Sequence, residues 1–179
     1  MQKIFFPLMV LVVVAGLACK KKLPSSDAVK VDLKNYLSVE MPKHAGLLKL
    51  LGSVKENYNE GNSSKKEPRE REENENDLLA EALNSLKKTQ ISTEDLKRVH
   101  GELQQGVEKM HASFVKIAVL EKQSGAASSV AGTFSAIQDI IQGIKLMNDW
   151  SEDLEAGCKA NGLTAEFNAF QAHYGLKQK

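Results

Sequence analysis

The sequence predicts an all-α fold, an up-and-down helical bundle built on a long antiparallel helix hairpin. Two long stretches place apolar residues at spacings of three and four, which is the period of one helix face. These are residues 96–120 and residues 130–158, and a short break at Ser124 and Gly125 separates them. A short connection between two long helices makes them antiparallel neighbours. No alternating run of strand length competes with this pattern.

The first helix of the hairpin is predicted to open at Ser92 and Asp95, whose spacing resembles a capping box, and to run to about Gln123. Around thirty residues at the usual helical rise give a length of about 45 Å. Phe114 lies on the apolar stripe of this helix, and Ile141 lies on that of the second. We expect each to be buried against the other helix or the layer beneath, where truncation to alanine costs about 2–5 kcal/mol.

Shorter helices flank the hairpin. Residues 27–58 carry helical stripes that Pro42 ends or kinks, and together with residues 77–175 they are predicted to form one domain. The Asn-Gly pair at 161–162 suits a left-handed turn, after which Thr164 is predicted to cap a last short helix. The apolar face of that helix comprises Leu163, Phe167, Phe170 and Tyr174.

Residues 59–76 differ from the rest of the chain in composition. They hold Gly, Asn, Ser and a dense alternation of Lys, Arg and Glu, with no apolar residue except Pro68. Such a stretch buries too little surface to offset its ordering entropy. It is therefore predicted to be a charged, flexible linker.

The N-terminus resembles an export signal. Residues 4–17 are almost entirely apolar, a run shorter than the roughly 20 residues that cross a bilayer, and three lysines follow at 20–22. Residues 1–18 are therefore predicted to be a signal peptide. Gly16-Leu17-Ala18-Cys19 resembles the lipobox of bacterial lipoproteins, in which small residues precede a cysteine that is acylated and becomes the mature N-terminus.

This resemblance implies lipidation at Cys19, residues 19–26 as a tether, and membrane lipid as a partner through the acylated cysteine. It also implies a place in the bacterial cell envelope. Lys20 after the cysteine resembles the signal that permits export to the outer membrane rather than retention at the inner one. Cleavage by the ordinary signal peptidase is the open alternative, because Gly16 and Ala18 are small residues at the positions that this enzyme reads.

Charge and cysteine usage exclude several classes. Without residues 1–18 the basic and acidic residues balance, because the leader holds one lysine and no acid. The chain therefore lacks the clustered basic excess of a nucleic-acid-binding protein. Once Cys19 is acylated only Cys158 remains, so the fold has no disulfide framework. Cys158 falls on an apolar stripe and is predicted to be a buried, unreactive thiol.

Three residues are candidate metal ligands. Glu108 and His111 form a Glu-x-x-His pattern, which di-iron bundles use in pairs, and the sequence holds no second copy. His100 lies eleven residues before His111, about 16 Å along a helix, which is too far for the two rings to share an ion. We therefore predict no metal site and no cofactor.

Motifs of catalysis and phosphate binding are missing, including the Gly-rich loop, the Gly-x-Ser-x-Gly elbow and Cys-x-x-Cys. The chain is therefore predicted not to be an enzyme. We expect an envelope-anchored helical lipoprotein with an interaction, adaptor or structural role towards a protein partner that the sequence does not identify. Trp150 is a candidate interaction anchor, with half-buried packing on the bundle as the alternative. The alternative function is a bundle that binds a ligand or metal between its helices.

Overall fold

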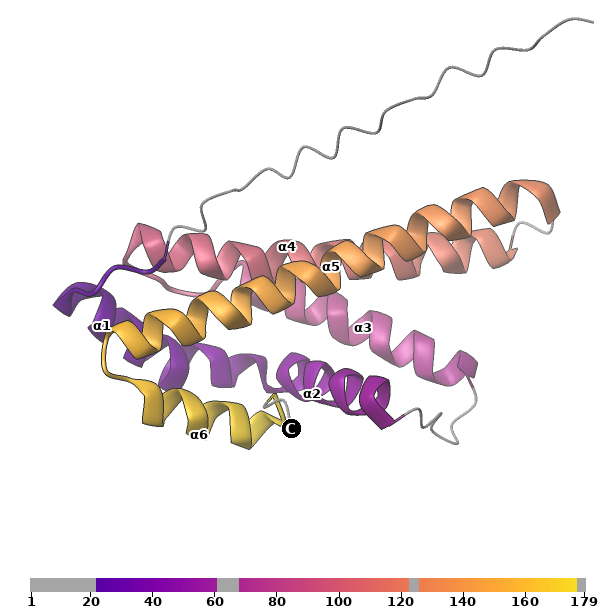
Figure 1. Ribbon diagram of the computed structural model, residues 1–179. Coiled ribbons are helices and arrows are strands. Elements are labelled where there is room, and N and C mark those ends of the chain that lie inside the picture. The colour runs from indigo at the N-terminus through magenta and orange to yellow at the C-terminus, as the bar shows by residue number, and fades with distance from the viewer. Residues whose placement is uncertain (1–21, 61–67, 123–125, 177–179) are drawn as a thin grey trace, which may run out of the picture.

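The computed structural model describes residues 22–60, 68–122 and 126–176, and all secondary structure in these ranges is helical. The longest helices, α4 (Glu94–Lys122) and α5 (Ala126–Ala160), form an antiparallel hairpin (Figure 1). The other helices are α1 (Asp27–Asn35), α2 (Ala45–Glu60), α3 (Pro68–Leu86) and α6 (Thr164–Tyr174). The prediction of an all-α bundle on a long helix hairpin is confirmed. Residues 1–18 and Cys19 lie outside the described residues.

The helices form two layers. The hairpin and α3, which lies along α4, make the first layer, and α1, α2 and α6 make the second layer on one side of it (Figure 1). Between α1 and α2 the chain tightens into one π-helical turn, Tyr36–Glu40, and one 3-10 turn, Met41–His44. Pro42 sits at the start of the second turn, where its missing N–H is tolerated, as the predicted kink requires.

The core lies between the layers and draws on all six helices. Its largest fully buried side chains include Tyr36, Phe167, Leu33, Met41, Leu48, Leu79, Leu86, Leu96, Leu103 and Leu154. The predicted apolar face of the last helix is buried too, because α6 packs Phe167 and Phe170 inward. Gly162 has the predicted left-handed conformation, with φ at 71°. Thr164, however, is the first residue of α6 and makes no cap, because Leu163 occupies the capping position.

The predicted tether extends less far than expected. Leu23 is 2% exposed and lies directly against Gly157 of α5, where the missing side chain leaves room for it. The Asn161 side chain accepts a hydrogen bond from the Ser26 backbone N–H and donates one to the Pro24 carbonyl, both at 3.2 Å. The assignment of residues 19–26 as a tether is thus wrong for Leu23 to Ser26, which are fixed to the end of α5.

The predicted flexible linker 59–76 is also wrong over most of its length. Residues 59–60 end α2, and α3 begins at Pro68 rather than near residue 77. Residues 61–67 lie outside the described residues. A helix can continue without apolar residues where its sequence favours the conformation, and proline at the first position followed by Arg and Glu does so. Leu79, Ala82 and Leu86 then anchor the second half of α3 in the core.

The predicted burial of Ile141 is wrong. Phe114 is half-buried and packs against the core, whereas Ile141 is 60% exposed. Gly143 of α5 faces α4, and Ile141 lies about 160° around the helix from it, so Ile141 is directed away from α4. The far end of the hairpin also extends beyond the second layer (Figure 1). Near the edge of that layer, Ile144 still lines a small cavity with Leu51 and Leu176. Beyond it, the same side of α5 has no described helix to cover it.

A carboxylate from another helix holds the residues just before α4. The Asp32 carboxylate of α1 accepts hydrogen bonds from the backbone N–H groups of Ser92 and Thr93, at 3.2 and 2.8 Å, and from the Thr93 hydroxyl at 2.7 Å. The predicted capping box of Ser92 and Asp95 is corrected, because α4 begins at Glu94 and Thr93, not Ser92, directly precedes it. The N–H groups that Asp32 satisfies belong to the two residues before the helix. An acidic group there also complements the positive end of α4.

Glycines allow α4 and α5 to approach closely. A Cβ on Gly143 would lie 2.8 Å from the Gly106 carbonyl oxygen, and a Cβ on Gly106 would lie 2.8 Å from that of Gly143. Backbone atoms cannot swing away from such a contact as a side chain can. The two residues therefore set the distance between the helices at the middle of the hairpin.

We expect Gly143→Ala to lower the free energy of unfolding by about 1–3 kcal/mol, because it overpacks this contact. Gly101→Ala is the matched control. The new Cβ would meet nothing within 4 Å, and the substitution replaces a flexible residue of α4. The control should raise stability by roughly 0.5–1 kcal/mol. Chemical denaturation followed by circular dichroism measures both, and equal effects of the two variants would contradict the close approach.

Candidate functional site

His100, weighed in the sequence as a metal ligand, lies inside a chain of buried hydrogen bonds. Its Nε2 is 3.0 Å from the Leu86 carbonyl oxygen, and its Nδ1 is 3.0 Å from the Tyr36 hydroxyl. The Trp150 indole N–H donates to the same hydroxyl at 3.2 Å. The chain joins the end of α3, α4, the π-helical turn and α5.

The direction of every bond in this network is determined. A carbonyl oxygen only accepts, so Nε2 of His100 carries the proton and Nδ1 accepts from Tyr36. The Tyr36 oxygen in turn accepts from Trp150. Both ring nitrogens of His100 are thereby occupied, and neither is available to a metal ion or a substrate.

Burial and this geometry keep the ring neutral. Burial is the main cause that lowers the pKa of His100 below its usual 6.5, against smaller opposing effects of the Leu86 carbonyl and Glu40. Burial also raises the pKa of the Tyr36 hydroxyl well above its usual range, so it remains a donor. The network therefore has the features of a structural element rather than of an acid or base.

The other candidate ligands do not join His100. Glu108 is exposed and His111 is half-buried, and the described residues contain no group of three or more His, Cys, Asp or Glu side chains that could hold a metal ion. Cys158 is fully buried, as predicted, and burial raises the pKa of its thiol to about 12. A thiol in that state supplies almost no thiolate, which is the reactive form.

Trp150 is not an exposed anchor. It is 2% exposed and donates its N–H inside the core, so the assignment as an interaction residue and the half-buried alternative are both corrected. Sequence alone did not show this, because the acidic neighbours of Trp150 suggested a surface. The polar atom that satisfies its N–H belongs to Tyr36, which is 114 residues away.

A second polar cluster holds the connection between α3 and α4. The Glu40 carboxylate accepts from Lys43 at 2.7 Å and from the Gln90 backbone N–H at 3.3 Å. These bonds, the Lys43 bond above all, keep the pKa of Glu40 below its usual value. His44 meets the Thr89 hydroxyl at 3.0 Å, and burial lowers its pKa. Asp32, Glu40 and His44 thus hydrogen-bond residues 89–93 and hold this connection against the second layer.

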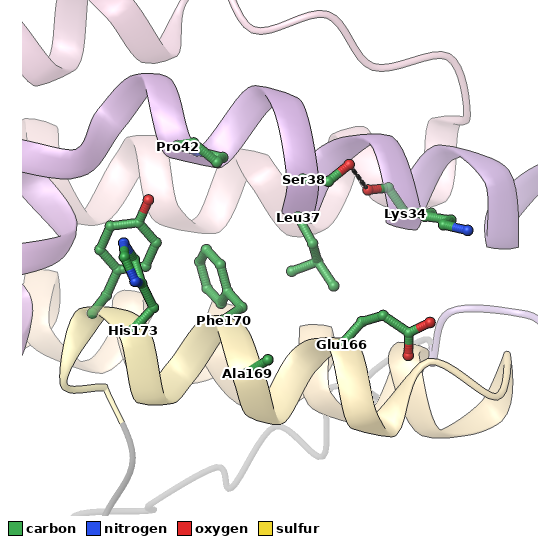
Figure 2. A pocket seen from close by; sticks show the side chains of 9 residues that line it. Lys34, Leu37, Ser38, Pro42, Glu166, Ala169, Phe170 and His173 are labelled. Atoms are coloured by element: carbon green, nitrogen blue, oxygen red, sulfur yellow. Dashed lines mark hydrogen bonds between the residues drawn. The ribbon is translucent and has the colours of Figure 1, made fainter.

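A groove lies between α6 and the segment that joins α1 to α2. Its volume is about 470 Å³, and sequence reasoning gave no sign of it. Leu37, Phe170 and Tyr174 form its apolar wall, while Lys34 and Glu166 lie at one end (Figure 2). We call it the α6 groove. Its volume is within the usual range of small-molecule sites.

The second feature that sequence reasoning missed is an exposed apolar strip on α5. It comprises Phe134, Ile137, Ile141 and Ile144, which are 62%, 45%, 60% and 37% exposed. We call these four residues the hairpin face. Single exposed apolar residues are ordinary, but a contiguous strip of large ones marks a contact surface more often.

Comparison with known proteins found no matching family model, and no significant match among curated proteins or solved structures. Among the described residues, none of the helices combines the length and the apolar character needed to cross a membrane.

Stability should fall with acid because of the two buried histidines. The folded state keeps His100 and His44 neutral, whereas the unfolded chain takes up protons near the usual pKa of 6.5. The free energy of unfolding should therefore be highest above that pH and decrease as pH falls below it. Denaturant unfolding from neutral pH to about pH 5 measures this. His100→Gln should flatten the dependence, whereas His173→Gln, at an exposed position, should not.

Tyr36→Phe should lower the free energy of unfolding by about 1–3 kcal/mol, because it leaves two buried polar atoms without partners, Nδ1 of His100 and the indole N–H of Trp150. Tyr174→Phe removes the same atom from a tyrosine outside the network and is the matched control. Thermal unfolding of both variants tests this. An equal loss in the control would show that the network contributes nothing specific.

Proposed function

We propose that this chain is a lipid-anchored, non-catalytic protein of the bacterial cell envelope, more specifically of the outer membrane, which acts by contacting a protein partner through the hairpin face. The observation that carries the contact role is the exposure of four large apolar side chains in one strip of α5. The anchoring role rests on the sequence around Cys19.

The anchor follows from the apolar run at residues 4–17 and the lipobox-like Gly16-Leu17-Ala18-Cys19. Each buried methylene of an acyl chain contributes about 0.8 kcal/mol, and several chains together hold a protein at the bilayer. Lys20 to Lys22 add attraction to anionic headgroups, on the order of 1 kcal/mol each. The fold begins at Leu23, so the domain would lie close to the lipid surface.

The non-catalytic role is supported by the state of the reactive side chains. His100 has both ring nitrogens in hydrogen bonds, and the Cys158 thiol is buried with a raised pKa. Neither can act as a base or a nucleophile without unfolding its surroundings. Contact with another protein is a function that requires neither.

A second candidate function is the binding of a small apolar molecule in the α6 groove. Its favouring observation is the volume of about 470 Å³ with an apolar wall and charged groups confined to one end. Phe170→Asp would place a charge in that wall. If the groove holds a ligand, native mass spectrometry should detect that ligand on the purified wild-type chain and not on the variant.

Cys19→Ala should remove the anchor. The wild-type chain should fractionate with membranes and incorporate labelled palmitate in a bacterial host, and the variant should do neither or should accumulate as an uncleaved precursor. Cys158→Ala is the matched control, because it removes the buried thiol and should leave labelling unchanged. Absence of label from the wild-type chain would favour cleavage by the ordinary signal peptidase.

The contact role can be tested in the membrane. A photo-crosslinking amino acid at Ile141 should yield a discrete crosslinked product, whereas the same amino acid at Val115 should not. Val115 is a fair control because it is 41% exposed, apolar and outside the hairpin face. Equal products from both positions would mean that the hairpin face is not a specific contact surface.

A further inference from the structure

The hairpin face borders the core at Ile144. Ile144, at its inner end, lines a small apolar pocket with Met147, Trp150, Leu51 and Leu176. Met147 and Trp150 are buried, while Ile144 is 37% and Ile141 is 60% exposed. Ile144 therefore lies at the edge of the core, and the face leads away from it along α5. Its four large apolar side chains are left exposed in the described part of the chain.

The part of α5 that carries the face holds few charges. Asp139 and Lys145 are the only charged residues over 126–148, in a chain of which 26% is charged. Asp139 is 4.0 Å from Lys109 of α4, so it is directed towards the other helix of the hairpin. Depletion of charge at the centre is what distinguishes protein interfaces from other surface.

The spacing of the face is symmetric. Residues 134, 137, 141 and 144 are separated by three, four and three positions, so the pattern reads the same in both directions about residue 139. Two such helices packed antiparallel about a two-fold axis there place Phe134 opposite Ile144 of the second copy and Ile137 opposite Ile141. An isologous contact of this kind requires a surface that complements itself.

The same register accounts for Phe134, the most exposed residue of the hairpin face. It is 62% exposed, and in this arrangement it lies opposite Ile144 of the second copy, beside the apolar side chains of Leu51 and Leu176. A large aromatic side chain covered by apolar groups of the partner is a usual form of interface hot spot.

We propose that the occupant of the hairpin face is a second copy of this chain, with the two α5 helices antiparallel and centred on Asp139. This inference rests on the proposed function, in that it takes the hairpin face as the contact surface and names the partner. Four side chains form a smaller contact than the roughly 20–30 residues a side of a standard interface. Association is therefore weak in dilute solution, and anchoring in one membrane would raise the effective concentration of the copies.

Disulfide crosslinking of the full chain in membranes tests the register. In a Cys158→Ala background, Phe134→Cys together with Ile144→Cys should give a chain of doubled mass after mild oxidation, and a reductant should reverse it. Each single variant should stay monomeric, because ten helical residues separate the two copies of one position by about 15 Å, too far for a disulfide. Any crosslink through Cys19 would appear equally in the single variants.

Ile141→Asp in the double-cysteine chain should abolish the crosslink, whereas Val115→Asp should leave it intact. Circular dichroism should find both variants folded, since both side chains are exposed in the native chain. Crosslinking of the single variants to the same extent as the pair, or equal effects of the two aspartates, would overturn the inference.

The two levels of the proposal fail differently. If the double-cysteine chain stays monomeric while the photo-crosslinker at Ile141 captures a different protein, the second copy is wrong and the contact role stands. If the double-cysteine chain stays monomeric and the photo-crosslinker at Ile141 captures nothing, both the second copy and the contact role are wrong.

Discussion

The hydrogen-bonded chain from Trp150 through Tyr36 and His100 to the Leu86 carbonyl fixes how the second layer lies on the hairpin. Apolar packing is not directional and tolerates sliding, whereas each of these bonds requires one donor to meet one acceptor. Leaving any of the atoms unpaired inside the core costs about 1–3 kcal/mol. The network therefore specifies a single register among the many that leucine-rich helices would allow.

A second constraint acts on the connection between α3 and α4. Asp32, Glu40 and His44 all come from the first half of the second layer, and all bond to residues 89–93. The two clusters together hold one end of the bundle at several points. At the opposite end, the hairpin extends past the second layer, and no comparable network is described there. The polar networks described above thus lie at one end of the bundle, and the exposed hairpin face lies towards the other.

Under the proposed function, this asymmetry separates the part of the chain that holds the fold together from the part that would contact a partner. The reactive groups that a sequence search selects, His100 and Cys158, are at the specified end and serve packing. The surface with no structural use, the hairpin face, is at the other end. A protein whose task is contact needs a rigid support and an apolar surface presented away from it. The α6 groove adds a separate cavity between α6 and the segment that joins α1 to α2.

The sequence by itself determined the helices. Helices and turns depend on local backbone geometry, which neighbouring residues set. The sequence shows them in the three-and-four spacing of apolar residues over 96–120 and 130–158, in the break between these stretches, and in the Asn-Gly pair at 161–162. The apolar stripe also showed that Cys158 would be buried. The expectations of a signal peptide and of lipidation at Cys19 rest on the sequence alone, since residues 1–19 lie outside the described residues.

Only the tertiary structure decided which stripes are covered. Phe114 and Ile141 both lie on apolar stripes in the sequence, yet Phe114 packs on the core and Ile141 is exposed, because which side of each helix is covered depends on how distant segments pack. The surroundings of Trp150 and Asp32 also depend on distant segments. Their hydrogen-bond partners are 114 and about 60 residues away, so no local pattern could identify them.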